Sequence, residues 1–359
     1  MTRPQPDDED QRRLLELLRS LGATDEELAS TPVEQRSALA LELVLRAGGP
    51  PMRLAAAAQR LNVPVEDLAR FWRALGFTGG PDAAPVPAAL VDAQEVLAAT
   101  SELIGAGAAL GLARVVGTAT ARLAEALVDS FRIGFELPEL DRGVRYSDVV
   151  NGYVGITRDA LPAFEAMIIA TFRAHLIRVA GGAWAPDLAG TAARRDLAVG
   201  FADLVGYTAL SRTLDPAALA QLLRRFEDQV SEVLAAHGGR LVKQIGDGVM
   251  FTADTAEEGA AIALGLAAAF GPAAAGAEGL PPVRVGLASG SVLTHYGDYY
   301  GDVVNLAARL VALAKPGTVV VSADTVAAAG AGWVVERLPD QALKGFGAPA
   351  TVFRLVAQA

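Results

Sequence analysis

The sequence predicts a two-part protein: an all-helical first half, then an α+β half with helices on one face of a mainly antiparallel sheet. Three observations lead to this prediction. Apolar residues recur at helical spacing through much of residues 11–182. Short apolar runs then alternate with helical stretches. Tight glycine-containing turns join some of these runs directly, which requires antiparallel pairing.

The composition is typical of a folded protein with aliphatic cores. Of the 359 residues, 52% are hydrophobic and 6% are aromatic, which argues against wholesale disorder. The formal net charge of -10 disfavours a main role in holding nucleic acid. Because the chain has no cysteine, disulfides, thiolate metal sites and cysteine nucleophiles are excluded.

The sequence also favours a cytoplasmic protein without a membrane span. The first residues, MTRPQPDDEDQRR, are acidic and polar, unlike a signal peptide. The two longest apolar runs, 161–177 and 259–277, are interrupted by charged residues or by Gly271 and Pro272. We therefore expect both runs to form packed helices.

Start and stop signals mark the helices of the first half. Four leucines at helical spacing precede Gly22, which ends the first helix. Thr31 and Glu34 have the spacing of a capping box, with Pro32 at the first helical position, and they predict a second helix. The remaining predictions are two short helices around Asn62, a Pro-rich loop over 78–89, helices from Leu90 to about Ile133, and a long helix from about Thr157 to Gly181-Gly182.

Strands and helices interleave in the second half. The Gly-Asp-Gly segment inside RLVKQIGDGVMFTA predicts a hairpin of two strands over 240–253. Two glycines end the amphipathic helix before it. The predicted order is a strand over 198–208, a helix over 216–239, the hairpin, a helix, a strand over 282–293, a helix over 303–314, a strand over 317–322 and a final hairpin ending at 356.

The stretch GGAWAPDLAGTAARRD lies between the predicted helical half and the predicted α+β half, and its composition is typical of a linker. We place an all-helical N-terminal domain at 1–182, the linker at 183–196 and a second domain at 197–359.

Two lone acids lie in apolar, glycine-flanked segments of the second half. Asp203 stands where the first strand ends, and Asp247 lies at the tip of the hairpin. If these strands are neighbours, the two carboxylates repel each other unless a cation lies between them, and their hard oxygen ligands suit Mg²⁺ or Mn²⁺. Two-metal phosphoryl transfer uses this device, with ions roughly 3.5–4 Å apart. The alternative is that one acid caps a helix and the other serves the turn.

The segment that follows Asp203, LVGYT, is predicted to open a helix whose free backbone amides face phosphate. Farther along, Asn305 and Arg309 are four residues apart on a predicted helix and share a face. An amide and a guanidinium on one face suit recognition of sugar and phosphate oxygens. The alternative is two solvated surface residues.

Five motifs occur in one order over the last part of the chain: FADLVGYT, GGRLVKQIGDGVMF, RVGLASGSV, GDYYGDVVNLAARL and LKGFGAPATVFRL. Together they closely resemble the catalytic domain of class III nucleotide cyclases. The resemblance implies a ferredoxin-like fold. It also implies that two divalent ions are bound by Asp203, by Asp247 and by the carbonyl of Leu204.

The resemblance assigns roles to further residues as well. It implies that Asn305 orients the ribose, that Arg309 stabilises the α-phosphate, and that Arg284 and Lys344 hold the triphosphate. Such cationic groups would stabilise the charge of the transition state. Thr208, in the segment after Asp203, is a further candidate substrate-binding residue.

Base preference depends on two further positions. In the family, two residues recognise the base. One lies four residues before the hairpin acid, here Asp247, and the other lies seven residues before the asparagine, here Asn305. A lysine at the first position and an aspartate at the second suit adenine. Here these positions are Lys243 and Asp298, which matches the adenylyl type. Asp302 has the wrong offset from Asn305 for this role.

The resemblance also implies a head-to-tail homodimer. Lys243 and Asp247 lie roughly 13 Å apart along one extended strand, so a single chain would have to bind the nucleotide in an extended pose. In the implied dimer, one chain supplies Asp203, Asp247 and Arg284. Its partner supplies five residues: Lys243, Asp298, Asn305, Arg309 and Lys344. A symmetric dimer then forms two complete sites.

The first half resembles, more loosely, the helical regulatory domain of some actinobacterial cyclases. The segment RLNVPVEDLARFWRALGF also has the look of a helix-turn-helix, but its acids and the lack of a basic arm favour a packing unit over DNA binding. The signal could be a small molecule, a lipid bound by the aliphatic helices, or a proton taken up by His175, His237 or His295.

The leading hypothesis is therefore an adenylyl cyclase, regulated by its helical half, that converts ATP to cyclic AMP and pyrophosphate. The alternatives are a guanylyl cyclase, a nucleotide-sensing module without turnover, and a DNA-binding regulator.

Overall fold

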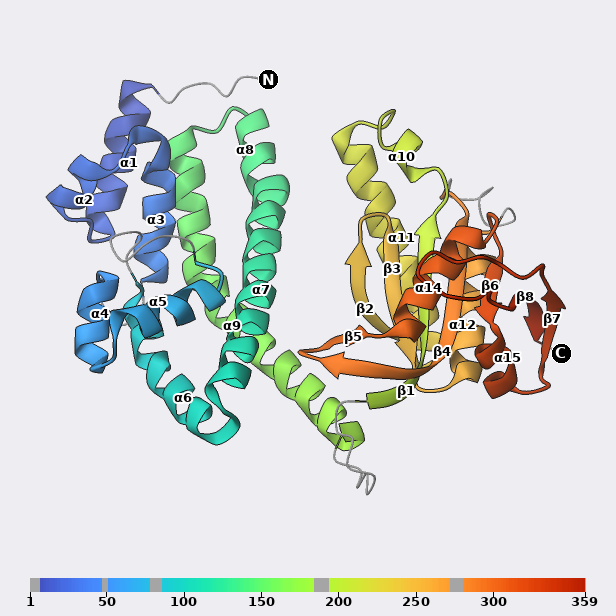
Figure 1. Cartoon of the computed structure of the whole chain (residues 1–359). Coiled ribbons are helices and arrows are strands. Elements are labelled where there is room, and N and C mark those ends of the chain that lie inside the picture. Colours follow the sequence, from blue (N-terminus) through green and yellow to red (C-terminus); the bar gives the residue numbers. More distant parts are fainter. Residues whose placement is uncertain (1–6, 47–50, 78–85, 184–193, 272–279, 359) are drawn as a thin grey trace. The chain divides into compact units, whose positions relative to one another are not determined.

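A computed structural model of the chain describes residues 7–46, 51–77, 86–183, 194–271 and 280–358 (Figure 1). The chain divides into two compact units, Met1–Pro186 and Asp187–Ala359. The predicted loop over 78–89 and the predicted linker lie mostly outside the described residues.

The described part of the first unit is helical, as predicted. Two buried apolar clusters hold it together: one joins α1, α3 and α9, and the other joins α4, α5 and the start of α6. The helices are α1 (Asp8–Ser20), α2 (Asp25–Ser30), η1 (Val33–Gln35), α3 (Arg36–Leu45), α4 (Leu54–Leu61), α5 (Val65–Ala74), α6 (Ala88–Ile104), α7 (Ala106–Phe131), η2 (Arg132–Glu136), α8 (Leu137–Asp141) and α9 (Tyr146–Ala183).

The predicted capping box at Thr31 and Glu34 is wrong, because the box of this segment forms at Thr24 and Glu27. The backbone N–H of Glu27 donates to the Thr24 hydroxyl at 3.2 Å, and the backbone N–H of Thr24 donates to Glu27 Oε2 at 2.8 Å. Pro32 lies outside any α-helix with extended backbone angles (φ -54°, ψ 150°). The chain re-enters an α-helix only at Arg36, after a 3₁₀ turn.

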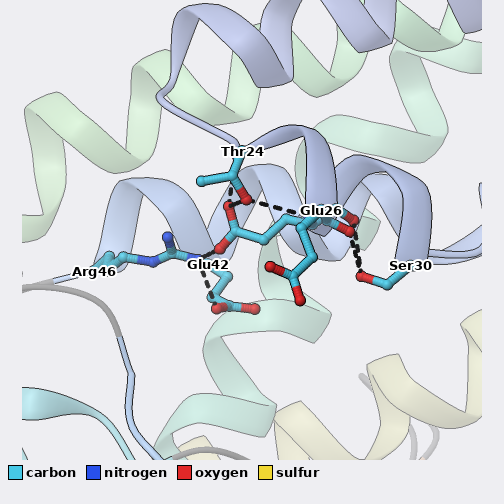
Figure 2. Close-up of polar contacts among 6 residues, drawn as sticks. Thr24, Glu26, Ser30, Glu42 and Arg46 are labelled. Carbon is cyan, nitrogen blue, oxygen red and sulfur yellow. Dashed lines mark hydrogen bonds and ion pairs between the residues drawn. The ribbon is translucent and has the colours of Figure 1, made fainter.

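The capping box also ties α2 to the end of α3. Arg46 Nη2 lies 2.8 Å from Glu27 Oε1 and 3.0 Å from Glu42 Oε1 (Figure 2). The backbone hydrogen bond from Thr24 is the largest influence on Glu27, and with Arg46 it lowers the pKa of this carboxyl despite partial burial. Glu27 therefore stays ionised and keeps both helices joined at neutral pH.

The long helix begins earlier than predicted. α9 starts at Tyr146, not near Thr157, and continues through Pro162 to Ala183. By length and composition, residues 146–181 of this helix could cross a membrane, since an 18-residue window within them has a mean hydropathy of 1.3. A core helix of a soluble protein passes the same test, so the expected absence of a membrane span and the cytoplasmic location stay predictions.

The second unit is built on one eight-stranded sheet in the order β2-β3-β1-β4-β6-β8-β7, with β5 paired to β4 off this path. All its pairs are antiparallel except β4 with β6. The strands are β1 (Arg194–Leu204), β2 (Arg240–Ile245), β3 (Gly248–Ala253), β4 (Val283–His295), β5 (Asp298–Tyr300), β6 (Val319–Ser322), β7 (Trp333–Arg337) and β8 (Val352–Gln358). The described helices are α10 (Tyr207–Leu210), α11 (Pro216–Ala236), α12 (Ala256–Ala269), α14 (Asp302–Leu313) and α15 (Ala323–Ala329).

Helices cover both faces of this sheet, which corrects the prediction of one covered face. Successive residues of a strand point to opposite faces. Ala198 and Ala202 of β1 belong to the apolar cluster that includes α11 and α12. Leu197 and Val199 belong to a second cluster with Ala307 and Leu310 of α14. The mainly antiparallel α+β class itself is confirmed.

Gly286 of β4 sets how closely α14 packs against the sheet. A Cβ built at Gly286 would lie 2.1 Å from the backbone N of Val311 and 2.6 Å from the carbonyl O of Ala307, both on α14. Backbone atoms at these distances must move, and this helix carries Asn305 and Arg309.

We expect Gly286→Ala to lower the free energy of unfolding by about 1–3 kcal/mol, the usual cost of overpacking a core. Urea unfolding of the purified chain measures this change. Gly332→Ala is the matched control, because a Cβ there meets nothing within 4 Å. Equal stabilities of the two variants would contradict the close packing of α14.

Candidate active site

Asp203 and Arg284 lie directly opposite each other on β1 and β4. The Arg284 Nε and Nη2 atoms lie 2.8 and 2.5 Å from Asp203 Oδ2. Their side chains are 25% and 37% exposed, so solvent still reaches the pair. The sheet register therefore brings a carboxylate and a guanidinium together at the end of β1.

The β2–β3 hairpin delivers Asp247 to the same place. Its two-residue turn has Gly246 at φ 62°, as a type II′ turn requires. The backbone N–H of Leu204 donates to the carbonyl of Asp247 at 3.2 Å. Gly248 gives Asp203 room, because a Cβ there would lie 2.9 Å from the Ala202 carbonyl and 3.4 Å from Asp203 Oδ1.

The two carboxylates influence each other electrostatically. Burial raises the pKa of Asp247, and the negative charge of Asp203 raises it further, against the lowering effect of Arg284 and a backbone hydrogen bond. A cation between the acids would relieve this repulsion.

The donor set at this place fits hard divalent ions. Asp203, Asp247 and the carbonyl of Leu204 are oxygen donors on adjacent strand ends. In the described part of the chain, no group of three or more histidine, aspartate or glutamate side chains gathers as a metal site. Ions held here would therefore need further ligands from a bound phosphate chain and water.

A second ion pair lies on β2 and β5. Lys243 Nζ is 2.5 Å from Asp298 Oδ2, and the backbone N–H of Tyr299 donates to Asp298 Oδ1 at 2.9 Å. The side chains of Lys243 and Asp298 are 38% and 29% exposed. A cationic donor and an anionic acceptor thus stand side by side at a solvent-accessible place.

The remaining candidate residues lie on the surface of the second unit. Asn305 and Arg309 are exposed on α14, Lys344 is exposed before β8, and Thr208 is exposed on α10. α10 is a single turn, so the predicted helix after Asp203 is short. In the described part of the chain, no side-chain hydrogen bond or ion pair joins these four residues to the two pairs above.

The residues around these pairs match a known protein family. Residues 191–355 match the family model of the adenylate and guanylate cyclase catalytic domain. An uncharacterized protein of Mycobacterium tuberculosis is 38% identical over 353 residues, which are 95% of this chain and 89% of that protein. An adenylate cyclase of Glutamicibacter nicotianae is 35% identical over 83% of this chain and 76% of its own length.

An adenylate cyclase of Streptomyces coelicolor is 38% identical over 267 residues, 74% of this chain and 68% of its own length. The chain belongs to the adenylate and guanylate cyclase family. The resemblance to class III cyclases that the sequence motifs indicated is therefore confirmed. The prediction that the protein is an enzyme of this class is confirmed as well.

Two side chains of this cyclase escaped the sequence analysis. Arg240 on β2 donates from Nη2 to the hydroxyl of Tyr299 on β5, and its Cζ lies 5.1 Å from the centroid of that ring. The pairing of Asp203 with Arg284 was not predicted either. Nothing in the local sequence signals these contacts, because the partners are 59 and 81 residues apart.

Proposed function

We infer that the cyclase converts ATP to 3′,5′-cyclic AMP and pyrophosphate. The observation that carries this inference is the contact between Lys243 and Asp298. Adenine offers an exocyclic amine as donor and N1 as acceptor, so a lysine donor beside an aspartate acceptor complements it. The relatives from Streptomyces coelicolor and Glutamicibacter nicotianae, both named adenylate cyclase, support the same choice.

Each candidate residue has a role in this reaction. The ribose 3′-hydroxyl releases its proton to water and its oxygen attacks the α-phosphorus, the bond from this phosphorus to the bridging oxygen breaks, and pyrophosphate leaves with both electrons of that bond. Asn305 orients the ribose, and Arg309 stabilises the negative charge that develops on the α-phosphate. Arg284, Lys344 and Thr208 bind the triphosphate.

Asp203, Asp247 and the Leu204 carbonyl would hold two Mg²⁺ or Mn²⁺ ions, which supply Lewis-acid stabilisation of phosphate charge and lower the pKa of the attacking hydroxyl. Arg284 neutralises Asp203 in the chain alone and would turn toward the triphosphate when the nucleotide binds. Burial is the main cause of the raised pKa of Asp247, and the nearby charge of Asp203 adds to it, so a cation beside the two acids would favour their ionised forms.

Two chains form each complete site in this proposal. One chain supplies Asp203, Asp247 and Arg284. Its partner supplies Lys243, Asp298, Asn305, Arg309 and Lys344. The exposure of Asn305 and Arg309 on α14 supports this division, because both side chains are available to a nucleotide held by another subunit. The helical unit regulates how the two catalytic units meet.

Turnover of ATP and GTP by the purified full chain with Mn²⁺ tests the base preference. We expect kcat/KM for ATP to exceed that for GTP, and Lys243→Ala to lower the ATP value by about a hundredfold, since a site built to hydrogen-bond a group rejects a mismatch strongly. A preference for GTP would instead support a guanylyl cyclase. No cyclic product from either nucleotide would leave a nucleotide-sensing module.

A further inference from the structure

The second contact between β2 and β5, from Arg240 to Tyr299, lies outside every role assigned so far. Among the described strands, β5 pairs only with β4, and β2 pairs only with β3. The two strands are therefore joined through side chains: Lys243 to Asp298, and Arg240 to Tyr299. Figure 1 shows the β4–β5 hairpin extending beside β2.

A β-bulge gives Arg240 its direction. Residues three apart on a regular strand point to opposite faces, and Arg240 and Lys243 are three apart. The register shifts between Leu241 and Lys243, so that Arg240 lies opposite Thr252 and Lys243 lies opposite Met250. Thr252 and Met250 are two apart on β3 and share a face. The bulge thus places both cations of β2 on one face.

Tyr299 connects this contact to the base-recognition acid. Its ring is only 6% exposed and belongs to the apolar cluster under α14. Its hydroxyl meets Arg240, and its backbone N–H donates to the neighbouring Asp298 at 2.9 Å. Arg240 therefore contacts the hydroxyl of Tyr299, and the backbone N–H of the same residue holds the carboxylate of Asp298.

The β4–β5 hairpin needs such an anchor. β5 has three residues, and its two-residue turn holds Tyr296 and Gly297 at φ 48° and 82°. A short hairpin is marginally stable without side-chain packing. The Lys243–Asp298 pair is too exposed to hold the hairpin alone, because exposed ion pairs contribute little.

We propose that Arg240 and Tyr299 are positioning residues for base selection, which hold Asp298 at a fixed place against Lys243. This inference rests on the proposed recognition of adenine by Lys243 and Asp298. Arg240 acts through Asp298 and does not touch the base. Its loss lets the β4–β5 hairpin move away from β2, so the acceptor for the exocyclic amine is no longer held in register.

The test is the ratio of kcat/KM for ATP to kcat/KM for GTP in the full chain with Mn²⁺. We expect Arg240→Ala and Tyr299→Phe each to lower this ratio by about tenfold, the effect of one lost hydrogen bond to the base. The change should lie mainly in the KM for ATP. Arg240→Lys should retain most of the ratio, because it restores a cation near the hydroxyl.

A matched control is Arg354→Ala, which removes the cross-strand ion pair with Glu336 between β8 and β7. This variant should keep the ratio of the unmodified chain. Thermal unfolding of each variant, followed by circular dichroism, separates a change in base selection from a loss of folded protein. A ratio that falls in Arg354→Ala as far as in Arg240→Ala would overturn the proposal.

A double variant separates this proposal from the function on which it rests. In an Asp298→Ala background, Arg240→Ala should lower the ratio no further, because its effect passes through the missing carboxylate. If Asp298→Ala lowers the ratio and Arg240→Ala leaves it unchanged, the positioning role is overturned while adenine recognition stands. If Asp298→Ala leaves the ratio unchanged, adenine recognition by this pair fails, and the positioning role fails with it.

Discussion

Replacing Asp203 with alanine is expected to lower cyclic nucleotide formation by about a thousandfold or more, since an ion that clamps the reacting phosphate would lose a ligand. The loss should appear in kcat and persist at high Mn²⁺. The folded state should survive, because Asp203 and Arg284 are both partly exposed and such a pair contributes little to stability.

Rates at saturating ATP over a series of Mn²⁺ concentrations measure this effect. Asp254→Ala is the control, because the side chain of this acid is 80% exposed. Its partner is Arg195, 3.6 Å away, which lies at the start of β1, whereas Asp203 lies near the end of that strand. It should keep nearly full activity. An Asp203→Ala chain with more than about a tenth of the original rate would contradict the metal role.

The second large effect is the recovery of activity from two inactive chains. Asp203→Ala and Arg309→Ala should each be nearly inactive alone, because every site of a homodimer then lacks one group. A heterodimer of the two variants contains one site with both defects and one site with none. We expect a heterodimer isolated through two different affinity tags to have about half the activity of the unmodified dimer.

The control for this experiment is a heterodimer of Asp203→Ala and Asp247→Ala. Both acids belong to the same half of the proposed site, so each of its two sites keeps one defect and no activity should return. Recovery in this control, or no recovery with Arg309→Ala, would contradict the proposed division of the site between chains. The second result would also point to a site contained within one chain, and the first would mean that Asp203 and Asp247 belong to different halves of the site.

Much of the fold was predictable because its signals are local. The turn at Asn62 was expected, and this residue adopts the left-handed conformation at φ 54°. The hairpin around Asp247 was expected from Gly246, whose positive φ the turn requires. Such signals depend on backbone preferences of a few consecutive residues, which the sequence displays directly.

Errors arose where tertiary contacts override local signals. Thr31 and Glu34 have the spacing of a capping box, but Thr24 and Glu27 have the same spacing and form the box, while Val33–Gln35 form a 3₁₀ turn before α3 begins at Arg36. The start of α9 was placed too late, since glycines at 152 and 155 weaken the helical pattern that packing against α1 and α3 maintains.

The sheet shows the same limit. β5 has three residues and forms only because β4 pairs with it, so no strand-length pattern announces it. The bulge between Leu241 and Lys243 is equally invisible, and with it the shared direction of Arg240 and Lys243. The sequence motifs supplied the candidate residues, and the register of the strands supplied their partners. Their assigned roles stay predictions.

The position of β5 has a consequence for how cyclases of this kind can diversify. Asp298 lies on a small hairpin off the main path of the sheet, whereas Asp203 lies on a central strand between β3 and β4. Exposed positions of β5, such as Tyr300, can change without disturbing the strand that carries Asp203, whereas the buried Tyr299 packs in one cluster with Leu197 and Val199 of that strand. With the roles proposed here, a change of nucleotide preference at Asp298 would leave the strand that carries Asp203 in place.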